Sequence, residues 1–325
     1  RLICAGHSSC DLPFRPVDKS VFDTDTVFAE DTKVLTGGDA LNSSATLAKL
    51  GLGADFKFVS IVGDDVYGRI TTEYLRTHGV RTDFIRVDPA ASSLVTVILI
   101  DKDNERHFVC HGNAARRLTL EDVTRQFDAD TAYLHIGSFM SLDGLEGENH
   151  KRLFQYAKER GVHTSFDVTF DNEGKWLEKI QAGLAYTDLM FASYDEAVNL
   201  TGGIKDPKEI GLFFKARGVK KFVLKLGKDG CYATDFTREY RVPTYRNRPV
   251  IDTTGAGDAF VAGYLYAMLR GLPMEACCVI GNVEGTLAVG TLGSHSGTGG
   301  LKEVKEFLRA NGAFHLDAEA LAAEL

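Results

Sequence analysis

The chain has 325 residues, of which 44% are hydrophobic and 25% are charged, as is usual for a globular protein. Its formal net charge of −8 argues against a nucleic acid partner, which would favour a clustered basic surface. No apolar run reaches membrane-spanning length, so we expect neither nucleic acid nor membrane among its partners.

The six cysteines are irregularly spaced, and none forms a C-x-x-C pair. In a chain of this length, such spacing argues against a disulfide framework and against a structural zinc site. We therefore expect reduced, buried cysteines in a cytoplasmic protein.

Short apolar runs rich in β-branched and aromatic residues recur, and segments with helical spacing lie between them. Helices are expected to end at Gly51, Gly79 and Gly161, because glycine commonly follows the last helical turn. Alternating strands and helices predict a mostly parallel sheet covered on both faces. The predicted strands are 2–5, 56–62, 133–136, 162–166, 189–192 and 222–226, and 317–325 is predicted as a terminal helix.

Two stretches interrupt this alternation. Residues 11–35 have no clear helical period, and 94–100 and 106–110 resemble two strands around the polar turn 101–104. We expect a small strand-rich excursion from the main domain; the alternative is an antiparallel edge of the same sheet.

Residues 252–258 have the sequence DTTGAGD, between a strand end expected at 250–251 and a helix over 260–269. Gly255, Ala256 and Gly257 let the backbone approach a ligand and leave amide N–H groups free to bind an anion. Asp258, in the first helical turn, can accept a proton from an alcohol that attacks phosphorus. The alternative is that Asp258 only complements the helix dipole.

DTTGAGD resembles the C-terminal signature of the PfkB/ribokinase family of carbohydrate kinases. Further family-like segments are GGDALN at 37–42, IVGDDVYG at 61–68 and LKLGKDG at 224–230, in family order. The resemblance covers roughly residues 1 to 300. It implies an α/β fold with a ribokinase-like doubly wound, mostly parallel sheet and a small β-sheet lid. The expected core is 1–11, 37–90 and 112–325, and the expected lid is 12–36 and 91–111.

The resemblance implies an ATP-dependent sugar kinase that transfers the γ-phosphate to a primary hydroxyl of ribose, fructose, 2-keto-3-deoxygluconate or a similar sugar. Asp258 would be the base, and residues 255–257 would hold the migrating charge. A nucleoside kinase is the first alternative, because Phe14, Phe108 and Phe139 could stack on a base. The others are a sugar-phosphate kinase and a sugar-binding regulatory protein on a kinase scaffold.

By the same resemblance, several positions acquire expected ligands. Those expected to bind the sugar are Asp11, Gly38, Asn42, Arg106 and Asn113. Those expected to bind ATP are Lys225, Gly227, Gly230, Gly255, Gly257 and Asn282, although Asn282 could instead pack within its helix.

The family pattern also implies Mg²⁺, organised through water by Glu196. Ser193 replaces the family's usual Asn, and a serine hydroxyl has fewer donors. Asp167, with Asp171 as a rival, is expected near phosphate, metal or substrate. A monovalent cation, K⁺, occurs beside the anion site in several family members; its positions here are Asp252, Thr254, Ala288, Thr291 and Gly293.

Many family members form homodimers through the lid. An open lid sheet exposes backbone edges and apolar side chains that proteins usually cover. We therefore expect a homodimer whose interface draws on Phe22, Val27, Phe28, Val95, Val97, Leu99 and Phe108.

Overall fold

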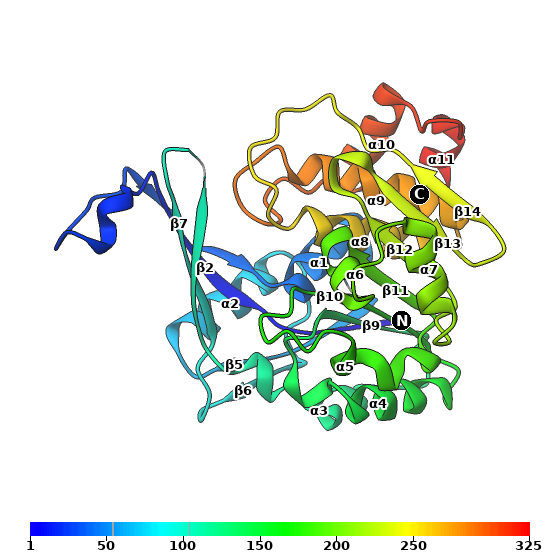
Figure 1. Ribbon diagram of the computed structural model, residues 1–325, viewed down its shortest axis with the longest axis horizontal. Coiled ribbons are helices and arrows are strands. Elements are labelled where there is room, and N and C mark those ends of the chain that lie inside the picture. Colours follow the sequence, from blue (N-terminus) through cyan, green and yellow to red (C-terminus); the bar gives the residue numbers. More distant parts are fainter. Residues whose placement is uncertain (54, 104) are drawn as a thin grey trace.

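The computed structural model describes residues 1–53, 55–103 and 105–325. Within them, the main feature is a nine-stranded sheet with the order β14-β13-β12-β11-β10-β9-β1-β5-β6 (Figure 1). Strands from β12 to β6 pair in parallel, and β13 and β14 join antiparallel. The strands are β1 (Leu2–Ala5), β5 (Phe56–Gly63), β6 (Ile85–Asp88), β9 (Tyr133–Phe139), β10 (His163–Val168), β11 (Leu189–Ser193), β12 (Phe222–Lys225), β13 (Cys231–Thr234) and β14 (Glu239–Val242).

Helices cover both faces of this sheet, because its central strands are apolar on both sides. Leu2 and Cys4 of β1 pack into one core cluster, whereas Ile3 and Ala5 pack into the other. The first cluster lies under α1 (Asp39–Leu47), α2 (Val66–Thr77), α8 (Ala256–Leu269), α9 (Met274–Ala288), α10 (Leu301–Asn311) and α11 (Ala318–Glu324). The second lies under α3 (Leu120–Thr124), α4 (Glu148–Lys158), α5 (Leu177–Ile180), α6 (Tyr194–Leu200) and α7 (Pro207–Lys215).

A second, five-stranded sheet stands away from the large one, at the left of Figure 1. We call it the lid. In it β2 pairs with β7 in parallel, and β3, β4 and β8 join antiparallel. Its strands are β2 (Ser9–Arg15), β3 (Asp31–Thr32), β4 (Leu35–Gly37), β7 (Leu94–Ile100) and β8 (Arg106–His111).

The predicted fold class, a mostly parallel sheet with a second small sheet, is confirmed. Except at 250–251, each predicted strand run overlaps a strand of one of the two sheets, and the terminal helix is present as α11. Asn104, in the predicted turn between β7 and β8, lies outside the described residues. The division into core and lid segments by residue number stays a prediction.

One predicted element is wrong. Val250 and Ile251 are not a strand end but an exposed bend, with exposed fractions of 67% and 53%. Pro249 cannot donate to a ladder. Ile251 instead donates its N–H to the carbonyl of Val289, beyond the end of α9. The anion-site loop is therefore attached to a helix end rather than to the sheet.

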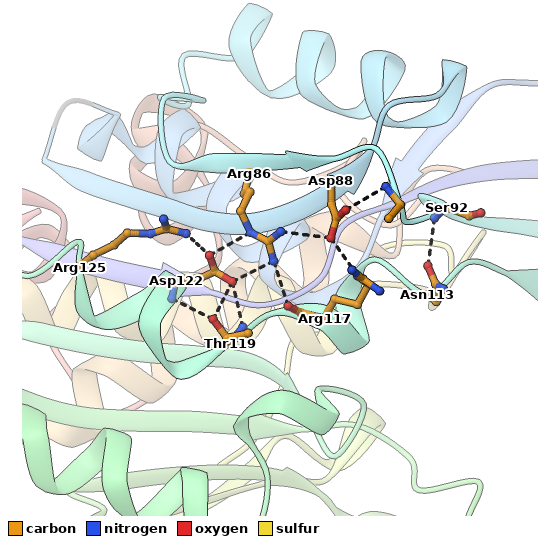
Figure 2. A network of polar contacts seen from close by, with 9 residues as sticks. Arg86, Asp88, Ser92, Asn113, Arg117, Thr119, Asp122 and Arg125 are labelled. Atoms are coloured by element: carbon orange, nitrogen blue, oxygen red, sulfur yellow. Dashed lines mark hydrogen bonds and ion pairs between the residues drawn. The ribbon is translucent and has the colours of Figure 1, made fainter.

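An ion-pair network joins the two ends of the β7–β8 hairpin to the edge of the large sheet (Figure 2). Arg86 on β6 donates from Nε to Oδ1 of Asp122 at 3.0 Å, and from Nη1 to Oδ2 of Asp88 at 3.1 Å. Arg117, which follows the hairpin, donates to the same Asp88 oxygen at 2.9 Å. The lid hairpin thus leaves and rejoins the core at one anchored point.

The described residues also contain short helical segments of other types. They are 3₁₀ turns at Lys19–Phe22, Ala115–Arg117, Asp143–Leu145, Gln181–Tyr186 and Gly227–Asp229, and a π-type turn at Ala48–Leu52. None of the helices in residues 1–53, 55–103 and 105–325 is long and apolar enough to cross a membrane.

Candidate active site

Polar side chains gather where three neighbouring strands end, opposite the N-terminus of α8. Asp167 lies near the end of β10, Ser193 ends β11 and Lys225 ends β12. Together with the first turn of α8 and Asn282 of α9, they line a cavity of about 540 Å³. Ligands of open α/β sheets bind at this edge, outside the carboxyl ends of the strands.

The N-terminus of α8 is shaped by Gly255. This N-cap residue has a φ of 74°, and a Cβ there would collide with the carbonyl oxygen of Ser294, so glycine is required. Past it, the amide N–H groups of Gly257 and Asp258 meet no acceptor in the part of the chain that the structure describes. Open amides and the helix dipole together form a site for a phosphate or a developing phosphoryl charge.

Asp258 lies in the first turn of α8, beside these amides. Its Oδ2 accepts a hydrogen bond from Nδ2 of Asn42 at 2.7 Å, and its carbonyl accepts one from the Ser43 hydroxyl at 3.2 Å. Burial and the charge of Asp39 raise the pKa of Asp258 well above its usual range, although Asn42 and Lys225 oppose the rise. A carboxylate with a raised pKa is a stronger base toward an alcohol proton.

Lys225 extends beside the anion site. A Cβ on Gly257 would lie 3.3 Å from its Nζ, which donates to Oδ2 of Asp167 at 2.5 Å. Burial opposes the charge of Lys225, but the charges of Asp167 and Glu196 outweigh it and raise the pKa of Lys225. Burial, reinforced by Glu196 and opposed by Lys225, raises the pKa of Asp167. Lys225 therefore remains a cation next to the open amides.

Ser193 and Glu196 both line the cavity and form a capping box at the start of α6. The Glu196 side chain accepts the Ser193 N–H at 2.7 Å, and the Ser193 hydroxyl accepts the Glu196 N–H at 3.5 Å. The serine that replaces the family's usual Asn is thus used as a helix cap. Of the two rival aspartates, Asp167 lines the cavity, whereas Asp171 accepts the N–H groups of Glu173 and Trp176.

A smaller pocket lies between the lid and the anion-site loop, lined by Asp11, Arg106 and Asp252 among others. Ser9 donates to Oδ1 of Asp11 at 2.7 Å. Burial raises the pKa of Asp11, and hydrogen bonds from Ser9 and Thr96 oppose that rise. A buried carboxylate at this place is suited to bind hydroxyl groups.

Gly38 and Asn42 lie where α1 begins, between the two pockets. Gly38 has a φ of 96°, and a Cβ there would lie 2.7 Å from the ring of His7. Asn42 is 4% exposed and its carboxamide bonds Asp258, so it does not lie on the exposed side of its helix. Asn42 therefore lies next to the expected base, and Gly38 lies against His7 and Ser8.

The remaining two sugar-site candidates lie apart from each other. Arg106 points to the anion-site loop: its Nη1 lies 2.9 Å from Oδ1 of Asp252 and donates to the Thr254 hydroxyl at 2.6 Å. Asn113 lies at the hinge of the lid hairpin, where its Oδ1 accepts the N–H of Ser92 at 3.0 Å (Figure 2). The structure thus brings Arg106, but not Asn113, to the small pocket.

Comparison with known proteins identifies the family of the chain. Residues 1–298 match the model of the pfkB family of carbohydrate kinases. The chain belongs to this family. It is a PfkB carbohydrate kinase with the ribokinase fold.

Individual relatives carry different names. Fructokinase-1 of rice, Oryza sativa subsp. japonica, is 31% identical over 244 residues, which are 72% of this chain and 74% of the relative. A ribokinase-type structure from E. coli in complex with ATP and Mg²⁺ has a TM-score of 0.80 at 22% identity, covering 96% of this chain and 99% of its own. A fructokinase double mutant from Vibrio cholerae, solved with fructose, ADP and a potassium ion, has a TM-score of 0.78 at 22% identity and covers 95% and 98%.

In this PfkB kinase, the expected monovalent-cation residues lie close together around the anion-site loop. Oδ1 of Asp252 accepts the Thr254 N–H at 2.8 Å, and Oδ2 accepts the Gly293 N–H at 3.0 Å. A Cβ on Gly297 would lie 2.7 Å from the Ala288 carbonyl and 2.6 Å from the Thr291 hydroxyl. Oxygen donors suited to K⁺ are therefore present, beside a carboxylate that Arg106 already contacts.

The expected ATP-binding residues of this kinase also line the large cavity, namely Gly227, Gly230 and Asn282. The Asn282 side chain donates to the carbonyls of Val242 and Pro243 at 3.2 and 3.0 Å. The side-chain N–H groups of Asn282 thus bind the main chain at the end of β14. Asn282 therefore forms part of the cavity wall without a free N–H group to offer a ligand.

The carboxylates of this PfkB kinase are compatible with Mg²⁺ held through water. No group of three or more His, Cys, Asp or Glu side chains suited to a metal occurs in residues 1–53, 55–103 and 105–325. Oδ1 of Asp167 is buried without a hydrogen-bond partner among these residues, and Glu196 lies on the same cavity wall. Mg²⁺ commonly keeps several waters and uses only one or two carboxylates, which fits such a pair.

Sequence reasoning missed three residues of the site. Asp39 lines the cavity and raises the pKa of Asp258; its place inside GGDALN was a usable signal. Ser294 and His295 contact Asn42, and they lie more than 250 positions from it in the sequence. Ser294 and His295 are polar residues of a loop, and nothing in the local sequence indicates that they contact Asn42.

Proposed function

We propose that this kinase transfers the γ-phosphate of ATP to a primary hydroxyl of a sugar or sugar acid, with Asp258 as the base. The observation that carries this proposal is the position of Asp258 in the first turn of α8. It is next to the open N–H groups of Gly257 and itself, and its pKa is raised.

In the proposed reaction, the sugar hydroxyl oxygen forms a bond to the γ-phosphorus as its proton moves to Asp258. The bond between the γ-phosphorus and the bridging oxygen breaks, and its electron pair leaves with ADP. The open amides of Gly257 and Asp258 and the cation of Lys225 stabilise the charge on the transferring group. Mg²⁺, near Asp167 and Glu196, would neutralise phosphate charge when bound.

The sugar is proposed to lie in the smaller pocket, between Asp11 and the start of α1. Asp11 would accept hydrogen bonds from sugar hydroxyls, Gly38 would allow close backbone approach, and Asn42 would lie beside the reacting hydroxyl. Closure of the lid over this pocket would exclude water from the transfer.

The test is an assay for ADP release across a panel of sugars, sugar acids and nucleosides. Asp258→Asn should lower turnover on the best substrate by about 10³-fold, as expected for loss of a general base, while ATP still binds. Asp11→Ala should weaken sugar binding far more than ATP binding in calorimetry. Near-normal turnover of folded Asp258→Asn would refute the role of Asp258, and unchanged sugar affinity of Asp11→Ala would refute the sugar site.

A nucleoside is the second candidate acceptor, because of Phe108. Its partner in the β7–β8 register is Ile98, a residue of the small-pocket wall, and its side chain is 54% exposed. An aromatic ring on this face could stack on a base. The same panel decides between the two classes, and Phe108→Ala would selectively impair nucleosides.

We also propose K⁺ as an activator and a homodimer formed through the lid. The oxygen donors around Asp252 support the first. The second is supported by exposed aromatic and aliphatic side chains on the lid: Phe22 at 84%, Phe28 at 91% and Val109 at 55%. An unpaired, apolar lid edge of this kind is usually covered by a partner, here a second copy of the chain.

A further inference from the structure

The side chain of Asn42 is held from both ends. Its Nδ2 donates to Oδ2 of Asp258 at 2.7 Å. Its Oδ1 lies 2.8 Å from Nδ1 of His295 and 2.9 Å from the Ser294 hydroxyl. Asn42, Ser294 and His295 are each at most 4% exposed, so no solvent competes for the side-chain carbonyl of Asn42.

The two contacts on Oδ1 are not equivalent. The Ser294 hydroxyl has one proton and three neighbours within reach: Oδ1 of Asn42, the Thr36 carbonyl at 3.1 Å and Nδ1 of His295 at 3.2 Å. A carboxamide oxygen only accepts, so the short contact with His295 requires a proton on Nδ1. The other ring nitrogen, Nε2, then accepts from the Thr36 hydroxyl at 3.3 Å.

The imidazole is fixed as well. Lys49 donates to the main-chain carbonyl of His295 at 2.8 Å, and Tyr74 packs edge-on against the ring at a centroid distance of 4.9 Å. Burial, with the charges of Lys49 and His78, lowers the pKa of His295 to about 3. The ring is therefore neutral near pH 7, when one tautomer satisfies both of its neighbours.

We propose that His295 is a positioning residue for phosphoryl transfer. It donates from Nδ1 to Asn42 and thereby keeps the Nδ2 group of Asn42 on the base, Asp258. This inference rests on the proposed role of Asp258, and His295 itself reaches neither sugar nor ATP.

The consequence is a defined effect on the base. A hydrogen bond donated to a carboxylate stabilises its ionised form, so loss of the Asn42 contact raises the pKa of Asp258. The other charged groups that act on Asp258 are Asp39 on α1, Lys225 on β12 and Asp167 on β10, and none of them changes with His295. The acid limb of the rate profile should then move to higher pH.

The test compares His295→Leu with His150→Leu in the full-length kinase. His150 is a matched control: it is fully buried and burial lowers its pKa to about 3, but its ring bonds the carbonyl of Ile180, the last residue of α5. We expect His295→Leu to lower kcat by about 10-fold at pH 7, with the KM for ATP unchanged and the acid limb moved up by about one pH unit.

Two further variants separate a positioning role from a packing role. His295→Gln keeps an N–H donor and should recover most of the rate, whereas His295→Leu combined with Ser294→Ala should be worse than either alone. His150→Leu should lower the melting temperature without moving the acid limb. An unmoved limb in folded His295→Leu, or an equal shift in His150→Leu, would overturn the proposal.

A measurement that needs no activity completes the test. Long-range ¹⁵N–¹H NMR of the histidine side chains should show His295 neutral with its proton on Nδ1, and a proton on Nε2 would overturn the proposal. If wild-type protein phosphorylates nothing on the panel, the proposed function fails instead. The NMR result then still reports whether the Asn42 contact exists.

Discussion

The guanidinium of Arg106 lies 2.9 Å from the carboxylate of Asp252 and joins the lid to the loop that forms the anion site. The Asp252 side chain is only 6% exposed, and the same Arg106 nitrogen donates to the Thr254 hydroxyl at 2.6 Å. Since Arg106 belongs to β8 and Asp252 begins the loop before α8, the position of the lid bears directly on the geometry of the proposed phosphate-binding turn.

Arg106→Gln should therefore lower kcat/KM for the sugar by about 10- to 100-fold, because a buried carboxylate left unpaired costs about 1–3 kcal/mol. With the guanidinium gone, the variant should also depend more strongly on K⁺ than the wild type does. The measurement is a rate series in K⁺ and in tetramethylammonium. Arg15→Gln is the control, because Arg15 forms an exposed pair with Asp31 elsewhere on the lid. Equal effects of the two substitutions would contradict the assigned link.

Asp258, the proposed base, should be costly to the stability of the fold. Burial and Asp39 raise the folded-state pKa of Asp258, so its favourable contribution exists below the ordinary pKa of an aspartate and is lost as pH rises through the raised value. Asp258→Asn should thus stabilise the protein at pH 8 by about 1 kcal/mol, as substitutions of strained catalytic groups often do. Thermal melts at pH 8 and near pH 4 check this, since the gain should vanish at the lower pH. A lower melting temperature at pH 8 would contradict it.

For Asp122, in the ion-pair network at the two ends of the β7–β8 hairpin, we predict that substitution lowers the stability of the fold. Asp122 is 4% exposed and pairs with Arg86 and Arg125, and its side chain also caps α3 by accepting the Thr119 N–H (Figure 2). Asp122→Asn should destabilise the protein by about 1–2 kcal/mol, because the guanidinium groups of Arg86 and Arg125, whose side chains are 34% and 54% exposed, lose a charged, buried partner. Against burial, these partners lower the pKa of Asp122, so the advantage of the wild type should fade as pH falls through the acid range.

Urea unfolding at pH 7 and at low pH measures this difference. Asp83→Asn is the control, since Asp83 pairs with Arg81 while 69% exposed and should change stability by less than about 0.5 kcal/mol. Similar losses for the two variants would show that the network is no stronger than a surface pair.

Much of the fold could be predicted because local patterns determine it. Buried strands such as β5 and β9 are unbroken apolar runs, and helices such as α4 end at a glycine of positive φ, Gly161. The edge strand β14 was not predicted, because its half-exposed residues have no apolar run. The bend at Ile251 was mistaken for a strand because only its partner, Val289, distinguishes the two.

Part of the candidate site could likewise be predicted from the sequence, and part could not. Gly255 and Asp258 are neighbours in one motif, so their proximity follows from the sequence. By contrast, the contacts of Asn42 with His295 and of Arg106 with Asp252 join segments that only the tertiary fold brings together. Polar side chains that are distant in sequence give no local signal of their contacts, so those pairs could be found only in the structure.

The lid offers the last prediction, which concerns association. Val109 on β8 is 55% exposed and pairs in register with Val97 of β7, on the face opposite to the Ile98 and Phe108 pair that faces the small pocket. If two copies cover each other's lids, Val109→Glu should place a charge in an apolar interface and split the dimer without touching the site directly. Val87→Glu provides a matched control, because Val87 is also 55% exposed but lies on β6, at the edge of the large sheet. Light scattering at micromolar concentration should give a dimer for the wild type and Val87→Glu, and a monomer with weaker sugar binding for Val109→Glu. A wild-type monomer with full activity would refute the lid interface, since an unpartnered lid would then suffice to close the sugar pocket.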